Sequence, residues 1–161
     1  MKVICYKILV SACLLGERVR YDAKINKIQH QLLEKWLHED IILPACPEVL
    51  GGLPIPRPAA EIKINGNIET AQGDDVSKAF SDGAQKTLAM ALKHNIKVAI
   101  LTERSPSCGS TEIYDGSFSR KVIDGQGMTT KLLRDNGVFV FNQFQLQEAQ
   151  NKLNELASSP I

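Results

Sequence analysis

The chain has 161 residues, of which 43% are hydrophobic and 23% charged, and its formal net charge is +1. This length and composition are typical of one soluble globular domain with a core of its own. The near-zero charge excludes a strong electrostatic footprint for nucleic acid, and no apolar run reaches the roughly 18 residues that a membrane span needs. We therefore expect neither a nucleic-acid nor a membrane partner.

The first part of the chain predicts two strands joined by a helix. The apolar runs at 8–10 and 41–43 are continuous rather than alternating, which is typical of strands covered on both faces. Between them, apolar residues step at three and four positions and so share one helical face; they are Ile25, Ile28, Leu32 and Trp36. Asn26 is the expected cap of this helix. A long insertion, from about 47 to 73, follows the second strand.

The second part repeats the alternation of helix and strand. Asp74 or Asp75 can cap a long helix with the apolar stripe Val76, Phe80, Ala84, Leu88, Ala91 and Leu92. The run 98–101 predicts a third strand, which a second insertion follows from about 102 to 127. Thr129 opens a short helix that Gly137 can close. A strand at 138–141 and a last amphipathic helix complete the chain, and that helix has the face Leu146, Ala149, Leu153 and Leu156.

This order of elements predicts the fold class. Strands alternating with helices indicate a single α/β domain over residues 1–157, followed by a frayed tail at 158–161. We expect a mostly parallel, doubly wound, Rossmann-like sheet with right-handed crossovers. Both insertions follow strands, so they lie at the carboxyl edge of the sheet, where such folds place their functional sites.

Three of the four cysteines come soon after predicted strands. Cys13 follows the first strand, Cys46 the second, and Cys108 lies in the small-residue loop SPSCGS after the third. Because the carboxyl ends of parallel strands share one edge, these three sulfurs can converge there. Cys5 precedes the first strand and is expected toward the opposite edge.

The three thiols allow three interpretations. They can be unrelated, Cys108 alone can be a nucleophile, or all three can hold a shared metal centre. Three thiolates suit a zinc ion with an open position, or an iron–sulfur cluster with one iron free for substrate. The histidines, His30, His38 and His94, lie in or beside predicted helices and give no support to zinc. A CxxC pair is also absent from the sequence.

The string Val10-Ser11-Ala12-Cys13 looks like the cleavage site of a bacterial lipoprotein signal. However, Lys7 interrupts the apolar stretch before it, and the run from Ile8 to Ala12 is shorter than the ~7 residues of a signal core. We therefore expect a cytoplasmic protein, in which structural disulfides are rare.

Several longer strings occur together. They are VSACLLG at 10–16, RYD at 20–22, CPEVLGGLP at 46–54, ERSPSCGS at 103–110, IYDG at 113–116 and GQG at 125–127. Together they resemble a small bacterial family, long of unknown function, whose characterised members are thiouracil desulfidases. The resemblance runs from about residue 7 to residue 142, nearly the whole chain.

The resemblance implies a [4Fe–4S] cluster held by Cys13, Cys46 and Cys108. It also implies that sulfur is replaced by oxygen on a thiolated pyrimidine base, a small-molecule substrate, without net redox change. The family's functional glutamate and serine match Glu48 and Ser105. One departure is Ala23, where the family pattern has a glycine after Tyr-Asp.

These residues suggest a reaction. A thiocarbonyl sulfur is soft and binds iron that lacks a fourth thiolate, which draws electrons from the carbon that water then attacks. Glu48 is expected to take the proton from water, with a pKa raised beside the cluster. Ser105 is the second expected catalytic residue, and the expected substrate-binding residues are Ser11, Arg57 and Ser107. The alternatives are a non-catalytic iron–sulfur or metal-sensing domain and a cysteine hydrolase, which lacks a histidine base on this edge.

Overall fold

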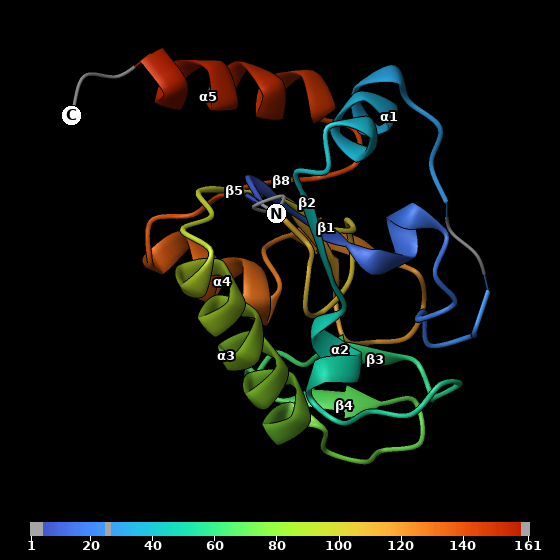
Figure 1. The fold of residues 1–161 in the computed structure, drawn as a ribbon. Coiled ribbons are helices and arrows are strands. Elements are labelled where there is room, and N and C mark those ends of the chain that lie inside the picture. The colour runs from blue at the N-terminus through green and yellow to red at the C-terminus, as the bar shows by residue number, and fades with distance from the viewer. Residues whose placement is uncertain (1–4, 25–26, 159–161) are drawn as a thin grey trace.

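A computed structural model describes residues 5–24 and 27–158 of the chain (Figure 1). Its centre is a four-stranded parallel sheet in the order β2-β1-β5-β8. These strands are β1 (Ile8–Ser11), β2 (Ile42–Ala45), β5 (Val98–Ile100) and β8 (Phe139–Phe141). Each coincides with one of the predicted apolar runs, so the expected strands are confirmed.

Helices cover both faces of the sheet (Figure 1). On one face, the strand residues Leu9 and Ala99 pack with α3 (Ser77–Lys93) and α4 (Met128–Asp135). On the other, Ile8 and Ile100 pack with α1 (Gln31–His38) and α5 (Leu146–Ser158). The α/β, doubly wound prediction is therefore confirmed, and the continuous apolar strands are explained by burial on both sides.

The helix ends differ from the predictions in several places. The first helix begins at Gln31 because the His30 side chain accepts the backbone N–H of Leu32, so the expected start at Asn26 is wrong. Residues 25 and 26 themselves lie outside the described residues. The N-cap of α3 is Val76, so neither Asp74 nor Asp75 occupies the expected cap position, although the Asp75 carboxylate accepts the N–H of Ser77 at 2.8 Å. Leu92 is 58% exposed and does not belong to the buried stripe.

The last two helices begin and end close to the expected residues. Helix α4 starts at Met128, one residue before Thr129, and Gly137 follows it with a positive φ of 86°. Helix α5 extends to Ser158, the first residue of the predicted tail, and residues 159–161 lie outside the described residues.

The two insertions carry small elements rather than bare loops. The first contains the short helix α2 (Pro47–Leu50) and an antiparallel hairpin of β3 (Ala60–Ile62) and β4 (Ile68–Thr70). The second contains a hairpin of β6 (Glu112–Tyr114) and β7 (Val122–Asp124). A 3-10 turn, η1 (Ala12–Leu15), follows β1. All of these follow strands of the main sheet and so extend from its carboxyl edge.

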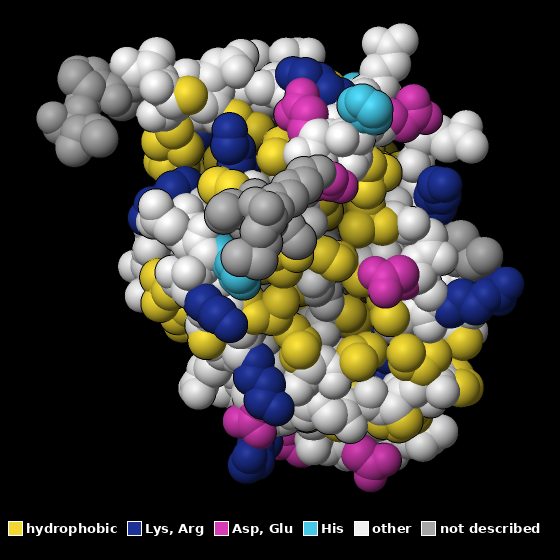
Figure 2. Space-filling model, viewed as in Figure 1, with side chains coloured by type: hydrophobic (Ala, Val, Ile, Leu, Met, Phe, Trp, Pro, Cys, Tyr) yellow, Lys and Arg dark blue, Asp and Glu magenta, His cyan; other side chains and the backbone are white. Residues whose placement is uncertain are grey.

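The surface agrees with the balanced charge of the sequence. On the face shown in Figure 2, hydrophobic side chains gather across the middle, and lysine, arginine and carboxylate side chains are scattered around them without a large patch of one charge. Within the described residues, none of the helices combines the length and apolar character required to cross a bilayer.

Candidate functional site

A cavity of about 480 Å³ opens at the carboxyl ends of β1, β2 and β5. It lies where the winding of the sheet reverses, since the chain leaves β1 toward β2 on one side and leaves β5 toward β8 on the other. Such reversal points leave a crevice outside the strand ends, which is where open α/β sheets bind ligands. Seven of the predicted site residues line this cavity: Ser11, Cys13, Cys46, Glu48, Arg57, Ser105 and Cys108.

The three cysteines reach the cavity from three different elements. Cys13 lies in η1, Cys46 precedes α2 as its N-cap, and Cys108 lies in the loop after β5. The Cys13 Sγ is 2.9 Å from the Thr102 Oγ1, which joins the ends of β1 and β5. Cys108 is 5% exposed. Cys5 is exposed and is absent from the cavity lining, as its position before β1 predicts.

The thiols influence one another electrostatically. Burial raises the pKa of the Cys108 thiol above its ordinary value, and Glu48, Cys46 and Cys13 raise it further. Burial also raises the pKa of the Cys46 thiol, to which Cys13 contributes. A nucleophilic cysteine needs the opposite, a lowered pKa that exposes thiolate at neutral pH. The interpretation of Cys108 as a lone nucleophile is therefore disfavoured.

The donor set suits iron and sulfide. All three converging side chains offer soft sulfur, and each stands on a separate element at the cavity wall. Within residues 5–24 and 27–158, no three His, Cys, Asp or Glu side chains stand together closely enough for one metal ion. A cluster makes a different demand, because each of its thiolates binds a separate iron.

The loop that carries Cys108 is held by hydrogen bonds within the loop and by contacts with helix α4. The Ser105 Oγ accepts the backbone N–H groups of Ser107 and Cys108, each at 3.1 Å. Behind the loop, the Thr130 Oγ1 donates to the Cys108 carbonyl at 2.9 Å. At Gly127 an added Cβ would stand 2.3 Å from the Ser107 carbonyl carbon, so only glycine allows α4 to approach this closely.

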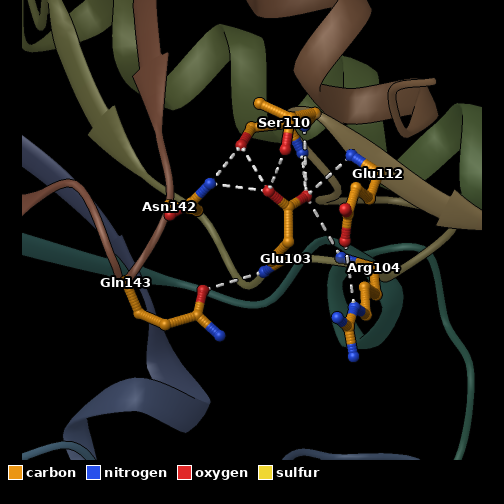
Figure 3. A network of polar contacts seen from close by, with 7 residues as sticks. Glu103, Arg104, Ser110, Glu112, Asn142 and Gln143 are labelled. Carbon is orange, nitrogen blue, oxygen red and sulfur yellow. Dashed lines mark hydrogen bonds and ion pairs between the residues drawn. The ribbon is translucent and has the colours of Figure 1, made fainter. Parts of the chain in front are cut away.

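Glu103, the second residue after Leu101, organises the same loop (Figure 3). Its Oε1 accepts four backbone N–H groups, those of Arg104, Ser110, Thr111 and Glu112. Its Oε2 accepts three side-chain donors, those of Ser110, Thr111 and Asn142. Burial by itself would raise the pKa of this carboxyl, but the hydrogen bonds outweigh it and lower the pKa from 4.5 to about 2. Glu103 is therefore ionised, and it ties the loop to the end of β8.

Glu48 and Arg57 form an ion pair on the cavity wall. The Arg57 Nε donates to the Glu48 Oε1 at 3.3 Å, and the Arg57 side chain is 3% exposed. The other two guanidinium nitrogens each donate to a backbone carbonyl, Nη1 to that of Pro54 and Nη2 to that of Val19. Burial raises the pKa of the Glu48 carboxyl, and Arg57 opposes that rise. Burial alone thus accounts for the expected rise in the pKa of Glu48.

The serines differ in where their hydroxyls lie. Ser11 lines the cavity, and its Oγ accepts the N–H of Thr102 at 3.0 Å. Ser107 is fully buried, and its Oγ is 2.7 Å from the Thr129 Oγ1. It does not line the cavity, so the structure gives Ser107 a role in packing the loop against α4 in place of the expected contact with substrate.

Sequence reasoning missed two buried carboxylates on the cavity wall, Glu103 and Glu61. A signal for Glu103 was present, because a charged residue close behind a fully apolar strand requires partners. Glu61 gave no comparable signal, since its partners lie in the second insertion, more than fifty residues away.

Comparisons with known proteins agree with this site. The sequence profile of the 2-thiouracil desulfurase family matches residues 8–145. The uncharacterized protein YbbK of Bacillus subtilis (strain 168) is 42% identical over 150 residues, which cover 88% of this chain and 98% of YbbK. The solved structure of the [4Fe-4S]-dependent thiouracil desulfidase TudS is similar at a TM-score of 0.90 and 45% identity, covering 92% of this chain and 98% of that one. Because these matches span nearly the whole fold and include the cavity, the chain belongs to the 2-thiouracil desulfurase family.

Proposed function

We infer that this protein is a [4Fe–4S]-dependent desulfidase that removes the sulfur of a thiouracil. The observation that carries this conclusion is the meeting of Cys13, Cys46 and Cys108 on one cavity in a chain of the 2-thiouracil desulfurase family. The similarity to TudS at 45% identity supports both the cofactor and the reaction.

The three cysteines are proposed to hold the cluster. When bound, the cluster supplies an iron without a protein thiolate, a Lewis acid to which a soft thiocarbonyl sulfur binds. The raised pKa values of Cys46 and Cys108 mean that these thiols give up protons when metal binds.

Glu48 is the proposed base. Its carboxylate lies on the cavity wall two residues after Cys46, and Arg57 fixes its orientation. In the proposed reaction, Glu48 takes a proton from water as the water oxygen attacks the thiocarbonyl carbon. Oxygen replaces sulfur, hydrosulfide leaves, and no electrons are exchanged, so neither an oxidant nor a reductant is required.

Ser105 and Ser11 are proposed to act on the substrate side. The Ser105 oxygen accepts two loop N–H groups, which leaves its own proton to donate toward the cavity. The Ser11 hydroxyl likewise accepts one N–H, that of Thr102, and keeps its own proton to donate. These donors suit the ring carbonyl and nitrogen of a pyrimidine. We propose a cytoplasmic location, because the reducing cytoplasm keeps cysteines in the thiol form that binding of the cluster requires.

The first test separates cofactor binding from turnover. Protein reconstituted with iron and sulfide without oxygen is assayed for absorbance, iron content and release of sulfide from 2-thiouracil. We expect Cys108→Ala to lose the colour, the iron and the activity together. Cys5→Ala is the matched control and should retain all three, because Cys5 is exposed and remote from the cavity.

Glu48→Gln tests the proposed base in the same assay. The amide still offers an oxygen to Arg57, so the fold and the cluster should be retained while turnover falls by about 10²–10⁴-fold. Full turnover by Glu48→Gln would remove Glu48 from the mechanism. A colourless, iron-free wild-type protein that still desulfurises 2-thiouracil would defeat the proposed function altogether. Cluster binding with no desulfuration would favour the sensing role.

A further inference from the structure

The turn of the second hairpin forms one wall of the cavity. Phe118 and Arg120 both line it, and both have positive φ values, 58° and 64°. Residues with a Cβ rarely adopt this left-handed region, and bulky ones do so only when their surroundings force them. Something outside the turn therefore holds it in this conformation.

A buried carboxylate on the first hairpin is in the position to do so. Glu61, in the middle of β3, is 8% exposed. Its Oε1 accepts the backbone N–H of Gly116 at 3.0 Å and that of Phe118 at 3.2 Å. One carboxylate oxygen thus accepts hydrogen bonds from two N–H groups of the turn. Hydrogen bonds to a charged acceptor are roughly twice as strong as those to a neutral one.

Lys63 completes the contact from the same hairpin. Its Nζ donates to the Gly116 carbonyl at 2.6 Å and lies 5.0 Å from the centre of the Phe118 ring. Gly116 has a φ of 93°, and a Cβ on it would stand 2.7 Å from the Ile62 carbonyl oxygen. The backbones of the two hairpins therefore touch at Gly116, between the two charged side chains.

The position of Glu61 is unfavourable for the first hairpin alone. Glu61 stands directly opposite Glu69 in the β3–β4 register. Like charges at opposed positions destabilise a strand pair. The Glu61 carboxylate accepts its hydrogen bonds from the second hairpin. These contacts therefore stabilise the cavity wall and not the β3–β4 pair.

We infer that Glu61 is a positioning residue for substrate binding. Its carboxylate locks the turn so that Phe118 and Arg120 form a fixed part of the cavity wall. The inference rests on the proposed function, because the effect of the wall is measured through the binding of a thiouracil. A wall residue that takes no part in the proton transfer stabilises bound substrate and transition state alike, so its loss raises KM and leaves kcat unchanged.

The experiment compares two independent disturbances of the same contact. Glu61→Gln removes the charge, and Gly116→Ala pushes the hairpins apart without touching the cavity lining. We expect each to raise the KM for 2-thiouracil about fivefold or more, with kcat and iron content unchanged. Glu69→Gln and Gly66→Ala are the matched controls. Glu69 lies in the same hairpin outside the cavity, and a Cβ at Gly66, whose φ is 89°, meets nothing within 4 Å.

Hydrogen–deuterium exchange supplies a second readout that does not depend on activity. In Glu61→Gln, the amides of Gly116 and Phe118 should exchange faster than in wild type, with or without the cluster. If Gly116→Ala fails to fold by circular dichroism, Lys63→Met replaces it, because it removes the other charged contact and leaves the backbone unchanged.

Three results would overturn the inference. Unchanged exchange in Glu61→Gln would show that the carboxylate does not hold the turn. Faster exchange with an unchanged KM would make the contact purely structural. A raised KM in Glu61→Gln but in neither Gly116→Ala nor Lys63→Met would mean that Glu61 binds substrate directly. If the loaded wild-type protein lacks desulfidase activity, the proposed function fails, and calorimetric binding of 2-thiouracil to the variants takes the place of KM.

Discussion

At the scale of single residues, Glu103 shows how one carboxylate can hold a functional loop. Seven donors converge on its two oxygens, and four of them are backbone N–H groups of the segment that flanks Cys108 (Figure 3). The loop's conformation therefore depends on a negative charge at this point. Removal of that charge leaves the donors facing a neutral group that is a weaker acceptor.

Glu103→Gln should lower stability in a pH-dependent way. The folded-state pKa of about 2 lies below the ordinary 4.5, so the carboxylate stabilises the fold fully above about pH 4.5. This contribution is lost as the pH falls from 4.5 toward 2. At about pH 7 we expect Glu103→Gln to lower the free energy of unfolding by about 1–3 kcal/mol, with the gap to wild type narrowing in acid.

Urea unfolding of the metal-free protein across this pH range measures the effect. Glu112→Gln is the control, because its side chain forms an exposed ion pair with Arg104, and such pairs contribute little. A gap between wild type and Glu103→Gln that does not change with pH would contradict the role given to the charge.

Ala23 is a second informative residue. It occupies the position where the resemblance led us to expect glycine, and its φ of 58° is in the left-handed region. An alanine in this region is strained by about 1–2 kcal/mol. Replacement by glycine relieves this strain, but the greater conformational entropy of glycine in the unfolded state offsets about 0.4–1 kcal/mol of the gain. Ala23→Gly should therefore stabilise the protein by about 0.5–1 kcal/mol in thermal or urea unfolding. A loss of stability would mean that the turn at 20–23 has another conformation in solution.

At the scale of elements, α2 is positioned by its close approach to α3. A Cβ on Gly83 would stand 1.9 Å from the Pro47 carbonyl oxygen, and one on Gly51 would stand 2.0 Å from that of Ala79. The two helices thus meet backbone to backbone. This contact explains a glycine inside α3, where it otherwise lowers helix stability. Since Cys46 and Glu48 lie at the start of α2, the contact sets their place at the cavity.

Gly83→Ala tests this contact. The added methyl must push α2 away, so we expect a loss of stability of about 1–3 kcal/mol or more, together with reduced iron uptake on reconstitution. Gln85→Ala, two residues along the same helix and exposed, is the matched control. Normal iron content and stability in Gly83→Ala would show that α2 tolerates displacement.

At the scale of the whole molecule, cluster binding should stabilise the fold. The proposed ligands follow β1, β2 and β5, so a cluster bound by them would link three strands of the sheet and bind the folded chain in preference to the unfolded one. We expect the loaded protein to melt about 5–15 °C above the metal-free protein, and a chelator to reverse the difference. Cys13→Ala treated in the same way should show no such rise. An equal melting temperature with and without cluster would argue against three-strand ligation.

Much of this architecture is readable from the sequence, for physical reasons. The strands are continuous apolar runs, and the rule that parallel strands end on one edge brings Cys13, Cys46 and Cys108 together. Sequence reasoning missed both hairpins, whose strands β3, β4, β6 and β7 have only three residues each. For the first hairpin a signal was present, because the dipeptide Asn65-Gly66 follows an alternating polar and apolar run at 61–64. The roles of Glu61 and Ser107 depend on contacts between segments distant in sequence, which no local pattern reveals.

The three proposed ligands are spread along the chain, and this affects when a cluster can bind during synthesis and folding. Cys13, Cys46 and Cys108 lie on separate strand ends, and the last of them is held by α4 and by Asn142 through Glu103. A nascent polypeptide therefore has no complete binding place until almost all of the domain has been synthesised and folded. If these three cysteines hold the cluster as proposed, iron and sulfide reach a folded protein through the mouth of its cavity, and maturation follows folding as a separate step.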